Sequence, residues 1–414
     1  MKKCVGLIVI ELLIGHCFCN LSHQGLQNST RDRWCFMNSA IQALFHTRGF
    51  NEFLQQQDVA VQADSVAREY IALNKALKIA TGTLDPSSLY KEVRQKMHFD
   101  YGDVLDVDEF FSYLLNLGAF EVTANRLFGA EILSFIHLQV HESCSSTYSS
   151  MVKVASPSLE TRLSLGLRAN LGDSLSAYFA PEQLTGDNQV RCDWCKNKFN
   201  ATKQLRFASL PKVLILQLKR FEFNVSNMRN RKIDTPVPLT ANITLNRDWF
   251  TQQLQAKVGE HLMSYHLFAI IIHRGNADPR TGTSEGAHYW TYAKDYEDPA
   301  GQWWRFDDEQ VTGGMDAHVD TIISSGIDSY DRSGWPGVST PYFLFYELDS
   351  ESERALSGAT AVAMLERLPG KIDHSLMLTQ QVKLANVTSS VGFFQSIKNY
   401  TLKACRYISM LWRR

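Results

Sequence analysis

Cys35 stands where a loop feeds a predicted helix, and this position favours a reactive thiol. The amide groups of a first helical turn and the helix dipole stabilise a thiolate, which is the nucleophilic form of cysteine. The segment 35–54 supplies the helix, because its apolar residues recur at helical spacing and Gly49 lies near its expected end. Most cysteines at a helix start are inert core thiols, so Cys35 indicates catalysis only together with a base and a carboxylate.

A histidine and an aspartate far downstream complete such a set. His288 lies in the run 286–292, and Asp307 follows the aromatic run 303–306. We expect these runs to be strands joined by a turn, whose antiparallel pairing brings Asp307 beside His288. A carboxylate in that place holds the imidazole in one tautomer. Taken alone, His288 is more typical of a structural histidine.

The elements that must position these residues change in kind along the chain. The first third predicts helices, at residues 35–54, 59–80, 85–97 and 109–117. After about residue 126, β-branched and aromatic residues predict strands, at 132–140, 213–223, 265–273, 289–294, 303–306 and 342–347. A helical part followed by a strand-rich part indicates an α+β fold.

The composition excludes several classes of protein. The chain of 414 residues carries 42 basic and 43 acidic side chains, which gives no basis for nucleic-acid binding through global charge. Its 44% hydrophobic content is enough for a packed core, and eight cysteines are too few for a disulfide scaffold. Cys192 and Cys195 form a C-x-x-C pair, whose spacing suits a zinc site, a redox motif or coincidence.

Seven segments, taken in order, make the chain resemble the ubiquitin-specific protease family of cysteine deubiquitinases. The nucleophile segment, residues 35–44, reads CFMNSAIQAL, and the strand-like segment 210–221 reads LPKVLILQLKRF. The other five are residues 106–110, 265–275, 286–292, 303–308 and 342–346. The resemblance extends from about residue 25 to about residue 347.

The resemblance implies a papain-like cysteine protease fold and a catalytic domain at residues 20–347. A helical thumb would occupy about residues 20–125, β-ribbon fingers about 126–205, and a β-rich palm about 206–347. The implied activity is hydrolysis of the isopeptide or peptide bond after the C-terminal glycine of ubiquitin. Ubiquitin and ubiquitinated proteins are the implied partners.

The same resemblance assigns roles to individual residues. Cys35 matches the nucleophile, His288 the general base and acid, and Asp307 the orienting carboxylate. Asp308 matches a neighbouring acidic position that assists in some members, and His273 falls on a position outside the triad.

A structural zinc site at the fingertips is also implied. The family often has a second C-x-x-C upstream, and here that place reads His141-Glu-Ser-Cys144. Histidine is a normal zinc ligand, so His141, Cys144, Cys192 and Cys195 would form a Cys₃His site. The alternative is a site that has lost its metal. A bound zinc would contribute folding energy to fingers with little core of their own.

The loop before Cys35 departs from the family's pattern. The family's asparagine, a donor to the oxyanion, stands five residues before the nucleophile, whereas Asn28 is two residues further away. Either Asn28 still reaches the oxyanion or Asp32 takes its place, where a carboxylate would repel the charge. Trp34 is bulky where the family has small residues. Two alternatives to a deubiquitinase therefore stay open: a weak or inactive ubiquitin-binding adaptor, and a protease for a ubiquitin-like modifier.

Both ends of the chain suggest targeting or membrane association. Residues 1–19 combine a basic start with a short apolar run, which is typical of a secretory signal or anchor; a buried strand or helix is the alternative. The tail, residues 348–414, ends in a basic amphipathic stretch at 391–414, a candidate helix for a membrane surface, the body or a partner. Ubiquitin chemistry and the body cysteines favour a cytoplasmic or cytosol-facing enzyme, whereas the leader favours the secretory pathway.

Overall fold

The computed structural model describes residues 23–28, 33–77, 79, 82–99, 105–139, 150–192, 195–224, 229–275, 287–295, 301–330 and 337–365. The chain divides into two units, residues 1–359 and 360–414, and the first holds the sheets and the helices that pack on them. The leader 1–19 and the tail segment 391–414 lie outside the described residues. Within the described ranges, no helix combines the length and apolar character needed to cross a membrane.

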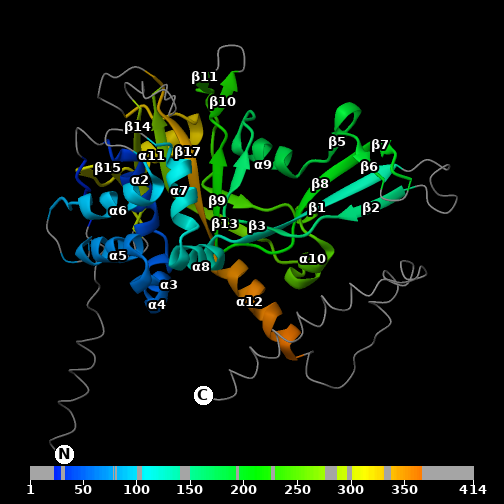
Figure 1. Ribbon diagram of the computed structural model, residues 1–414, viewed down its shortest axis with the longest axis horizontal. Coiled ribbons are helices and arrows are strands. Elements are labelled where there is room, and N and C mark those ends of the chain that lie inside the picture. Colours follow the sequence, from blue (N-terminus) through cyan, green and yellow to red (C-terminus); the bar gives the residue numbers. More distant parts are fainter. Residues whose placement is uncertain are drawn as a thin grey trace, which may run out of the picture. The chain divides into compact units, whose positions relative to one another are not determined.

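Helices α2 to α8 form what we call the helical region (Figure 1). They are α2 (Cys35–Phe45), α3 (Phe50–Gln55), α4 (Asp58–Ala63), α5 (Ser65–Leu77), α6 (Ser87–Met97), α7 (Val107–Leu115) and α8 (Gly118–Leu127). The single helix predicted over 35–54 is wrong, because Gly49 adopts a left-handed φ of 77° between α2 and α3. The helix predicted over 59–80 is likewise divided at Asp64, whose carboxylate accepts the N–H groups of Val66 and Ala67.

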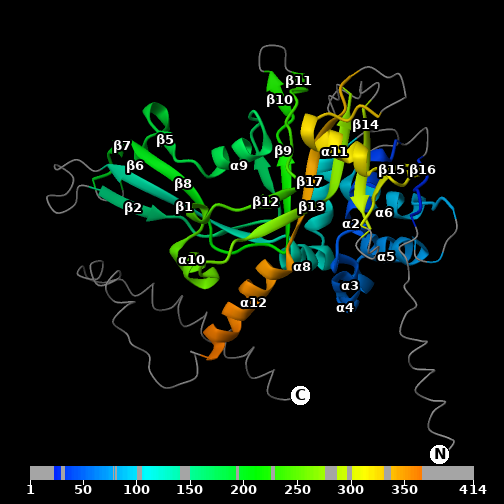
Figure 2. The ribbon, with the colours of Figure 1, turned by 180° about the vertical axis from the view of Figure 1, so that it is seen from behind.

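A mainly antiparallel sheet of eight strands, the central sheet, lies beside the helical region (Figures 1 and 2). Its strands run in the order β16-β15-β14-β13-β17-β9-β4, and β12 pairs with β13. Their bounds are β4 (Leu163–Leu165), β9 (Val213–Leu218), β12 (Asn242–Thr244), β13 (Ser264–Arg274), β14 (His288–Lys294), β15 (Trp303–Asp307), β16 (Gln310–Thr312) and β17 (Thr340–Leu348). The strands that carry His288 and Asp307 are therefore neighbours.

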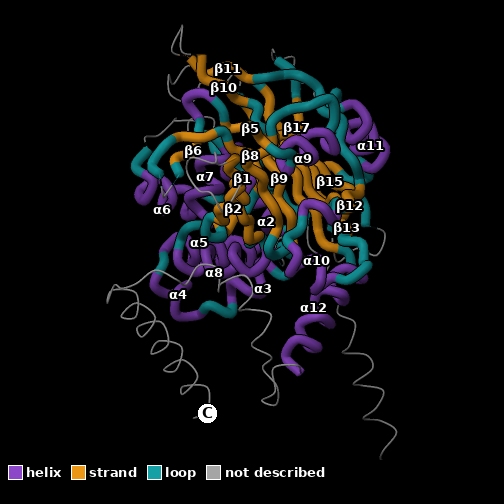
Figure 3. The backbone as a smooth tube through the Cα atoms, turned by 90° about the vertical axis from the view of Figure 1, so that its right-hand side faces the viewer, coloured by secondary structure: helices purple, strands orange, loops and turns teal. Residues whose placement is uncertain are grey.

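Alternate residues of the central strands enter two separate cores. In β13, Ala269 and Ile271 face a core shared with the helical region, whereas Ile270 and Ile272 face the opposite side. Helices α9 (Leu171–Phe179), α10 (Gln252–Val258) and α11 (Asp316–Ser325) contribute to that second core. Figure 3 shows the strands between α4, α5 and α6 on one side and α10 and α11 on the other. Because both faces are covered, the strands read as nearly continuous apolar runs.

Every residue of α2 is buried, and its apolar residues belong to the first core, where the helix packs with β13 and β14. A helix enclosed on all sides has little freedom to move relative to the sheet. The first residue of α2 and the first residue of β14 are thereby held at a fixed separation.

A second sheet, the outer sheet, extends from the central sheet on the side away from the helical region (Figures 1 and 2). It consists of β1 (Ala130–Gln139), β2 (Ser150–Val154), β3 (Ser158–Glu160), β5 (Glu182–Leu184) and β8 (Ala201–Phe207). Towards its end lies the hairpin of β6 (Val190–Arg191) and β7 (Lys198–Phe199), and a separate hairpin joins β10 (Phe221–Asn224) to β11 (Arg229–Lys232). Only Leu138 and Ala201 form a buried cluster near this end among the described residues. The α+β architecture expected from the sequence is confirmed, and α12 (Ser350–Leu365) follows β17.

Candidate active site

Cys35 is the first residue of α2 and is 2% exposed. The preceding residue, Trp34, makes no side-chain cap to the helix, so the first-turn amide groups remain available to an anion at this end. The Trp34 ring packs against Tyr90, with 4.8 Å between ring centroids, and belongs to the core of the helical region. The bulk of Trp34 in the loop before the nucleophile is therefore taken up by the core.

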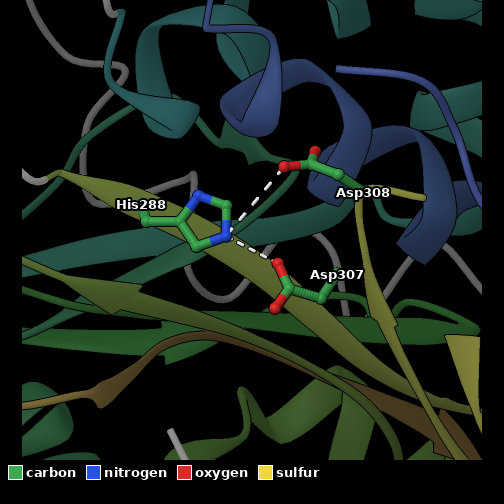
Figure 4. A group of neighbouring side chains, drawn as sticks. All are labelled: His288, Asp307 and Asp308. Atoms are coloured by element: carbon green, nitrogen blue, oxygen red, sulfur yellow. Dashed lines mark hydrogen bonds and ion pairs between the residues drawn. The ribbon is translucent and has the colours of Figure 1, made fainter. Parts of the chain in front are cut away.

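A hairpin brings the two aspartates to His288. β14 pairs antiparallel with β15, and β15 turns into β16 through the two-residue turn Asp308-Glu309. Asp308 adopts a left-handed φ of 51°, a conformation that aspartate tolerates better than most residues. Asp307 ends the strand and Asp308 starts the turn, so their carboxylates approach His288 from two directions (Figure 4).

His288 and Asp307 form a short hydrogen bond, with 2.6 Å between His288 Nε2 and Asp307 Oδ1 (Figure 4). Burial opposes a charge on the imidazole. Hydrogen bonds to Asp307 and to Cys35, together with the charges of both groups, outweigh this effect and raise the pKa of His288 well above its ordinary value. His288 therefore interacts with both the thiol and the carboxylate, an arrangement in which the imidazole can accept the proton of the nucleophile.

Asp308 holds two asparagine amides. Asn38 Nδ2 donates to Asp308 Oδ1 at 2.8 Å, and Asn28 Nδ2 donates to Oδ2 at 2.7 Å. His288 Nε2 lies 4.0 Å from the same Oδ2 (Figure 4). Burial raises the pKa of Asp308 to about 6, while the two amides and the charge of His288 act in the opposite direction.

Asn28 lies at the site despite the longer loop. Its Oδ1 accepts the backbone N–H of Trp34 at 2.7 Å, so its side chain joins the start of α2 to Asp308. The chain before it is fixed by a hydrogen bond from Leu26 N to Asp308 O at 2.9 Å. At Gly25, an added Cβ would lie 2.5 Å from the carbonyl oxygen of Glu309, so only glycine allows this close approach. Asp32 lies outside the described residues.

Two residues of the site were missed by the sequence analysis. Arg305 makes an ion pair with Asp307, with 2.6 Å from Nη2 to Oδ2. It stands two residues before Asp307 on β15, and this period-two spacing is a signal that could have identified it. Asn38 is one turn after Cys35 on α2, and helical spacing would have placed it on the same side as the nucleophile.

His273 occupies a buried position on β13, paired in register with Tyr289. Among the described residues, neither ring nitrogen has a hydrogen-bond partner. Burial, with the nearby charges of Lys232, His288 and Arg220, places the pKa of His273 well below its ordinary value. A neutral, enclosed ring of this kind is unsuited to the role of His288.

The structure describes two of the four expected zinc ligands. Cys192, which is buried, and Cys195, which is half-buried, lie at the turn between β6 and β7. The turn is closed by hydrogen bonds from Cys192 N to Asn197 O and from Lys196 N to Cys192 O. Two cysteines on one tight turn suit half of a tetrahedral zinc site. His141 and Cys144 lie outside the described residues.

Within the described ranges, one group of three metal-competent side chains has its ligand atoms close together, namely His288, Asp307 and Asp308. Each of these atoms already has a partner: His288 and Arg305 occupy the oxygens of Asp307, and two amides occupy those of Asp308. A guanidinium beside the carboxylate also disfavours a cation. The group is therefore better suited to proton transfer than to metal binding.

Comparison with known proteins gives one consistent result. The sequence pattern of the family described as "Ubiquitin carboxyl-terminal hydrolase" matches residues 24–346. A rice (Oryza sativa subsp. japonica) protein named ubiquitin carboxyl-terminal hydrolase 26 is 27% identical over 290 residues, which cover 67% of this chain and 25% of that protein. A chicken (Gallus gallus) protein named ubiquitin carboxyl-terminal hydrolase 48 is 28% identical over 233 residues, 55% of this chain and 20% of that protein. The chain thus spans about a quarter of the length of the curated relatives it matches.

Solved structures show a similar fold. The SAGA Ubp8/Sgf11/Sus1/Sgf73 DUB module bound to ubiquitin aldehyde superposes with a TM-score of 0.59 at 21% identity, covering 81% of this chain and 71% of the other. The yeast SAGA DUB module with an Sgf73 mutant superposes with a TM-score of 0.56 at 21% identity, covering 83% of this chain and 74% of the other. At this level of identity the similarity establishes the fold.

Proposed function

The chain belongs to the ubiquitin carboxyl-terminal hydrolase family, and on this premise we propose that it is a thiol-dependent deubiquitinase. Its reaction would be hydrolysis of the bond after the C-terminal glycine of ubiquitin in conjugates. The papain-like α+β fold of this family is the fold of the first unit. Ubiquitin and ubiquitinated proteins are the proposed partners.

The observation that carries the proposal is that His288 interacts with both Cys35 and Asp307. The distance from His288 Nε2 to Asp307 Oδ1 is 2.6 Å. An adaptor that only binds ubiquitin has no need of this arrangement, in which each group prepares the next for nucleophilic catalysis.

In the first step of the proposed reaction, the Cys35 thiolate attacks the carbonyl carbon of the terminal glycine. A carbon–sulfur bond forms and the carbonyl electrons move to oxygen. The imidazolium of His288 then gives its proton to the leaving nitrogen as the carbon–nitrogen bond breaks, which releases the amine and leaves a thioester. Asp307 keeps the imidazole oriented throughout.

In the second step, water attacks the thioester and gives a proton to His288. The tetrahedral intermediate expels the thiolate, so the ubiquitin carboxyl group is released and the thiolate–imidazolium pair is restored. The N–H groups at the start of α2 and the amide of Asn28 are the candidate donors to the oxyanion in both steps. The hydrogen bond of Asn28 to Asp308 uses one of the two N–H bonds of that amide.

The test is reaction with a ubiquitin whose C-terminus carries an electrophile. Wild-type protein should form a covalent adduct, and Cys35→Ala should form none. Binding without labelling by the wild type would instead support the adaptor. Probes built on ubiquitin-like modifiers, run in parallel, test the second alternative: labelling by one of these and not by the ubiquitin probe would identify a protease for that modifier.

We also propose a structural zinc ion bound by His141, Cys144, Cys192 and Cys195. The support is the placement of Cys192 and Cys195 on one closed turn, at an end of the outer sheet where little apolar core is described. Zinc there would stabilise the fold and take no part in the reaction.

A further inference from the structure

Arg305 is a buried cation on the far oxygen of Asp307. Its Nη2 lies 2.6 Å from Asp307 Oδ2, while His288 Nε2 lies 2.6 Å from Oδ1. The carboxylate therefore binds one positive group on each oxygen. Because a guanidinium and an imidazolium occupy separate oxygens, rotation of the Asp307 carboxylate away from His288 would break both interactions.

The guanidinium is itself held by an aromatic cage. Its central carbon lies 5.2 Å from the ring centre of Trp290 and 5.6 Å from that of Tyr330, and the Arg305 side chain is 8% exposed. Cation–π contacts of a desolvated arginine of this kind are among the stronger ones.

A buried aspartate fixes the cage. Asp328 accepts the indole N–H of Trp290 at 2.9 Å and the backbone N–H of Tyr330 at 2.9 Å. It also accepts the hydroxyl of Tyr292 at 2.9 Å and lies 2.8 Å from His318 Nε2. Asp328 is 3% exposed, so its charge is fully enclosed by these partners. The cage, and with it Arg305, is therefore rigid.

We propose that Arg305 is a positioning residue for the hydrolytic reaction: its guanidinium clamps Asp307 Oδ2 so that Oδ1 stays on His288. This inference rests on the proposed function. It extends the site beyond Cys35, His288 and Asp307 to a cation held by Trp290 and Tyr330.

A second consequence concerns the proton on His288. Arginine keeps its charge at every relevant pH, so it shares the negative charge of Asp307 with the imidazolium. A nearby positive charge disfavours an imidazolium and favours a thiolate. Loss of the Arg305 cation should therefore make His288 more basic and the thiolate less stable. The charged or titratable groups around His288 and Arg305 are Cys35 on α2, His273 and Arg274 on β13, Tyr292 on β14, Asp307 and Asp308 at the end of β15, His318 on α11, and Asp328 and Tyr330 after it, and the substitutions tested below replace none of them.

The test compares Arg305→Met, Arg305→Gln and Arg305→Lys by the pH dependence of kcat/KM on ubiquitin carrying a C-terminal fluorophore. Arg305→Met should lower kcat by about 10–100-fold with little change in KM, since an interaction acting through Asp307 is lost. Both limbs of the pH profile should move up by about 0.5–1 unit. Arg305→Gln keeps a hydrogen-bond donor without charge and should show the same shift with a smaller loss of rate. Arg305→Lys should return the limbs towards the wild-type position.

Lys294→Met is the matched control. It removes a lysine from the same two strands, two register pairs away from Arg305, where Lys294 faces the Trp303 ring at 5.2 Å, and it should leave the profile unchanged. The unfolding temperature of each variant shows whether the substitution causes a folding defect. The pH profile of Cys35 alkylation by iodoacetamide shows whether it changes the site itself.

Three results would overturn the inference. They are pH limbs that stay in place in Arg305→Met and Arg305→Gln, an equal shift in Lys294→Met, or a loss of rate that appears only in KM. Failure of the proposed function would look different, because wild-type protein would then show no turnover while the alkylation profiles could still be compared.

Discussion

Asn28 donates a hydrogen bond of 2.7 Å from its side-chain amide to the carboxylate of Asp308, although 280 positions separate the two residues in the chain. The bond joins the loop before the nucleophile to the turn after the triad aspartate. The asparagine therefore remains at the site although the loop is unusually long. Its Nδ2 donates to Asp308, and its Oδ1 accepts the backbone N–H of Trp34.

Replacing Asn28 tests whether it serves the oxyanion. Asn28→Ala should lower kcat by about 10²–10³ with KM within a few-fold, which is the usual cost of a lost oxyanion donor. Steady-state kinetics on a fluorogenic ubiquitin substrate measure this. Asn38→Ala is the matched control, since it removes the other amide from Asp308. A similar loss in both variants would show that Asn28 acts by holding Asp308, and no loss in Asn28→Ala would contradict a role in catalysis.

Gly25 offers a test of the close approach that fixes this loop. In Gly25→Ala the new Cβ would meet the carbonyl oxygens of Glu309 at 2.5 Å and Asp308 at 2.7 Å. Such overpacking should lower the free energy of unfolding by about 1–3 kcal/mol and reduce kcat by displacing the turn. Gly166→Ala, where nothing lies within 4 Å of the new atom, is the control. Denaturant titration measures the difference, and equal stability of the two variants would refute the steric account.

Asp106 predicts a pH dependence of stability. It caps α7 through Asp108 N and accepts the hydroxyl of Tyr342 at 3.0 Å. Burial raises the pKa of Asp106 from 3.8 to about 7, helped by the charges of Asp108 and Glu109 and opposed by these hydrogen bonds.

Because the folded pKa lies above the unfolded one, the native state binds the extra proton between about pH 4 and pH 7. The contribution of Asp106 to stability is therefore complete below pH 4 and is lost as the pH rises to 7. Asp106→Asn keeps the cap and should remove this slope, gaining up to about 4 kcal/mol relative to wild type between pH 4 and pH 7. Urea unfolding at several pH values measures it, and parallel slopes in the two proteins would contradict the assignment.

The zinc proposal predicts a metal content. Wild-type protein should contain about one zinc per chain by elemental analysis. Cys192→Ser and Cys195→Ser should lose it and unfold at a lower temperature, since structural zinc supplies folding energy. Cys35→Ser should keep the metal. A wild-type protein free of zinc after purification without chelators would indicate that the metal site has been lost.

The fold class and the family could be predicted from the sequence, because both leave patterns of residue type and spacing. The α+β class and the family are confirmed, because apolar runs buried on both faces leave a clear pattern and because seven motifs occur in order. The single strand predicted over 213–223 is wrong, since it is divided into β9 and β10, which belong to different sheets. The helix boundaries around Gly49 and Asp64 were wrong, since helical spacing continues through a short break that one left-handed residue or one capping carboxylate produces.

Other features had no local signal. Asp328 lies 21 positions after Asp307, and its role in holding Trp290 follows from the packing of α11 against the sheet, which periodicity does not encode. The pairing of Asn28 with Asp308 is equally non-local. The boundaries of thumb, fingers and palm, the nature of residues 1–19 and 391–414, and the compartment of the protein stay predictions.

The central claim is that Cys35, His288 and Asp307 act together in hydrolysis. The most direct measurement compares the turnover of ubiquitin amidomethylcoumarin by wild type, Cys35→Ala and Asp307→Asn. We predict turnover by the wild type, none by Cys35→Ala, and a loss of about 10²–10⁴ in kcat for Asp307→Asn, because the imidazole would lose its orienting carboxylate. Wild-type turnover no greater than that of Cys35→Ala, or full activity in Asp307→Asn, would contradict the account.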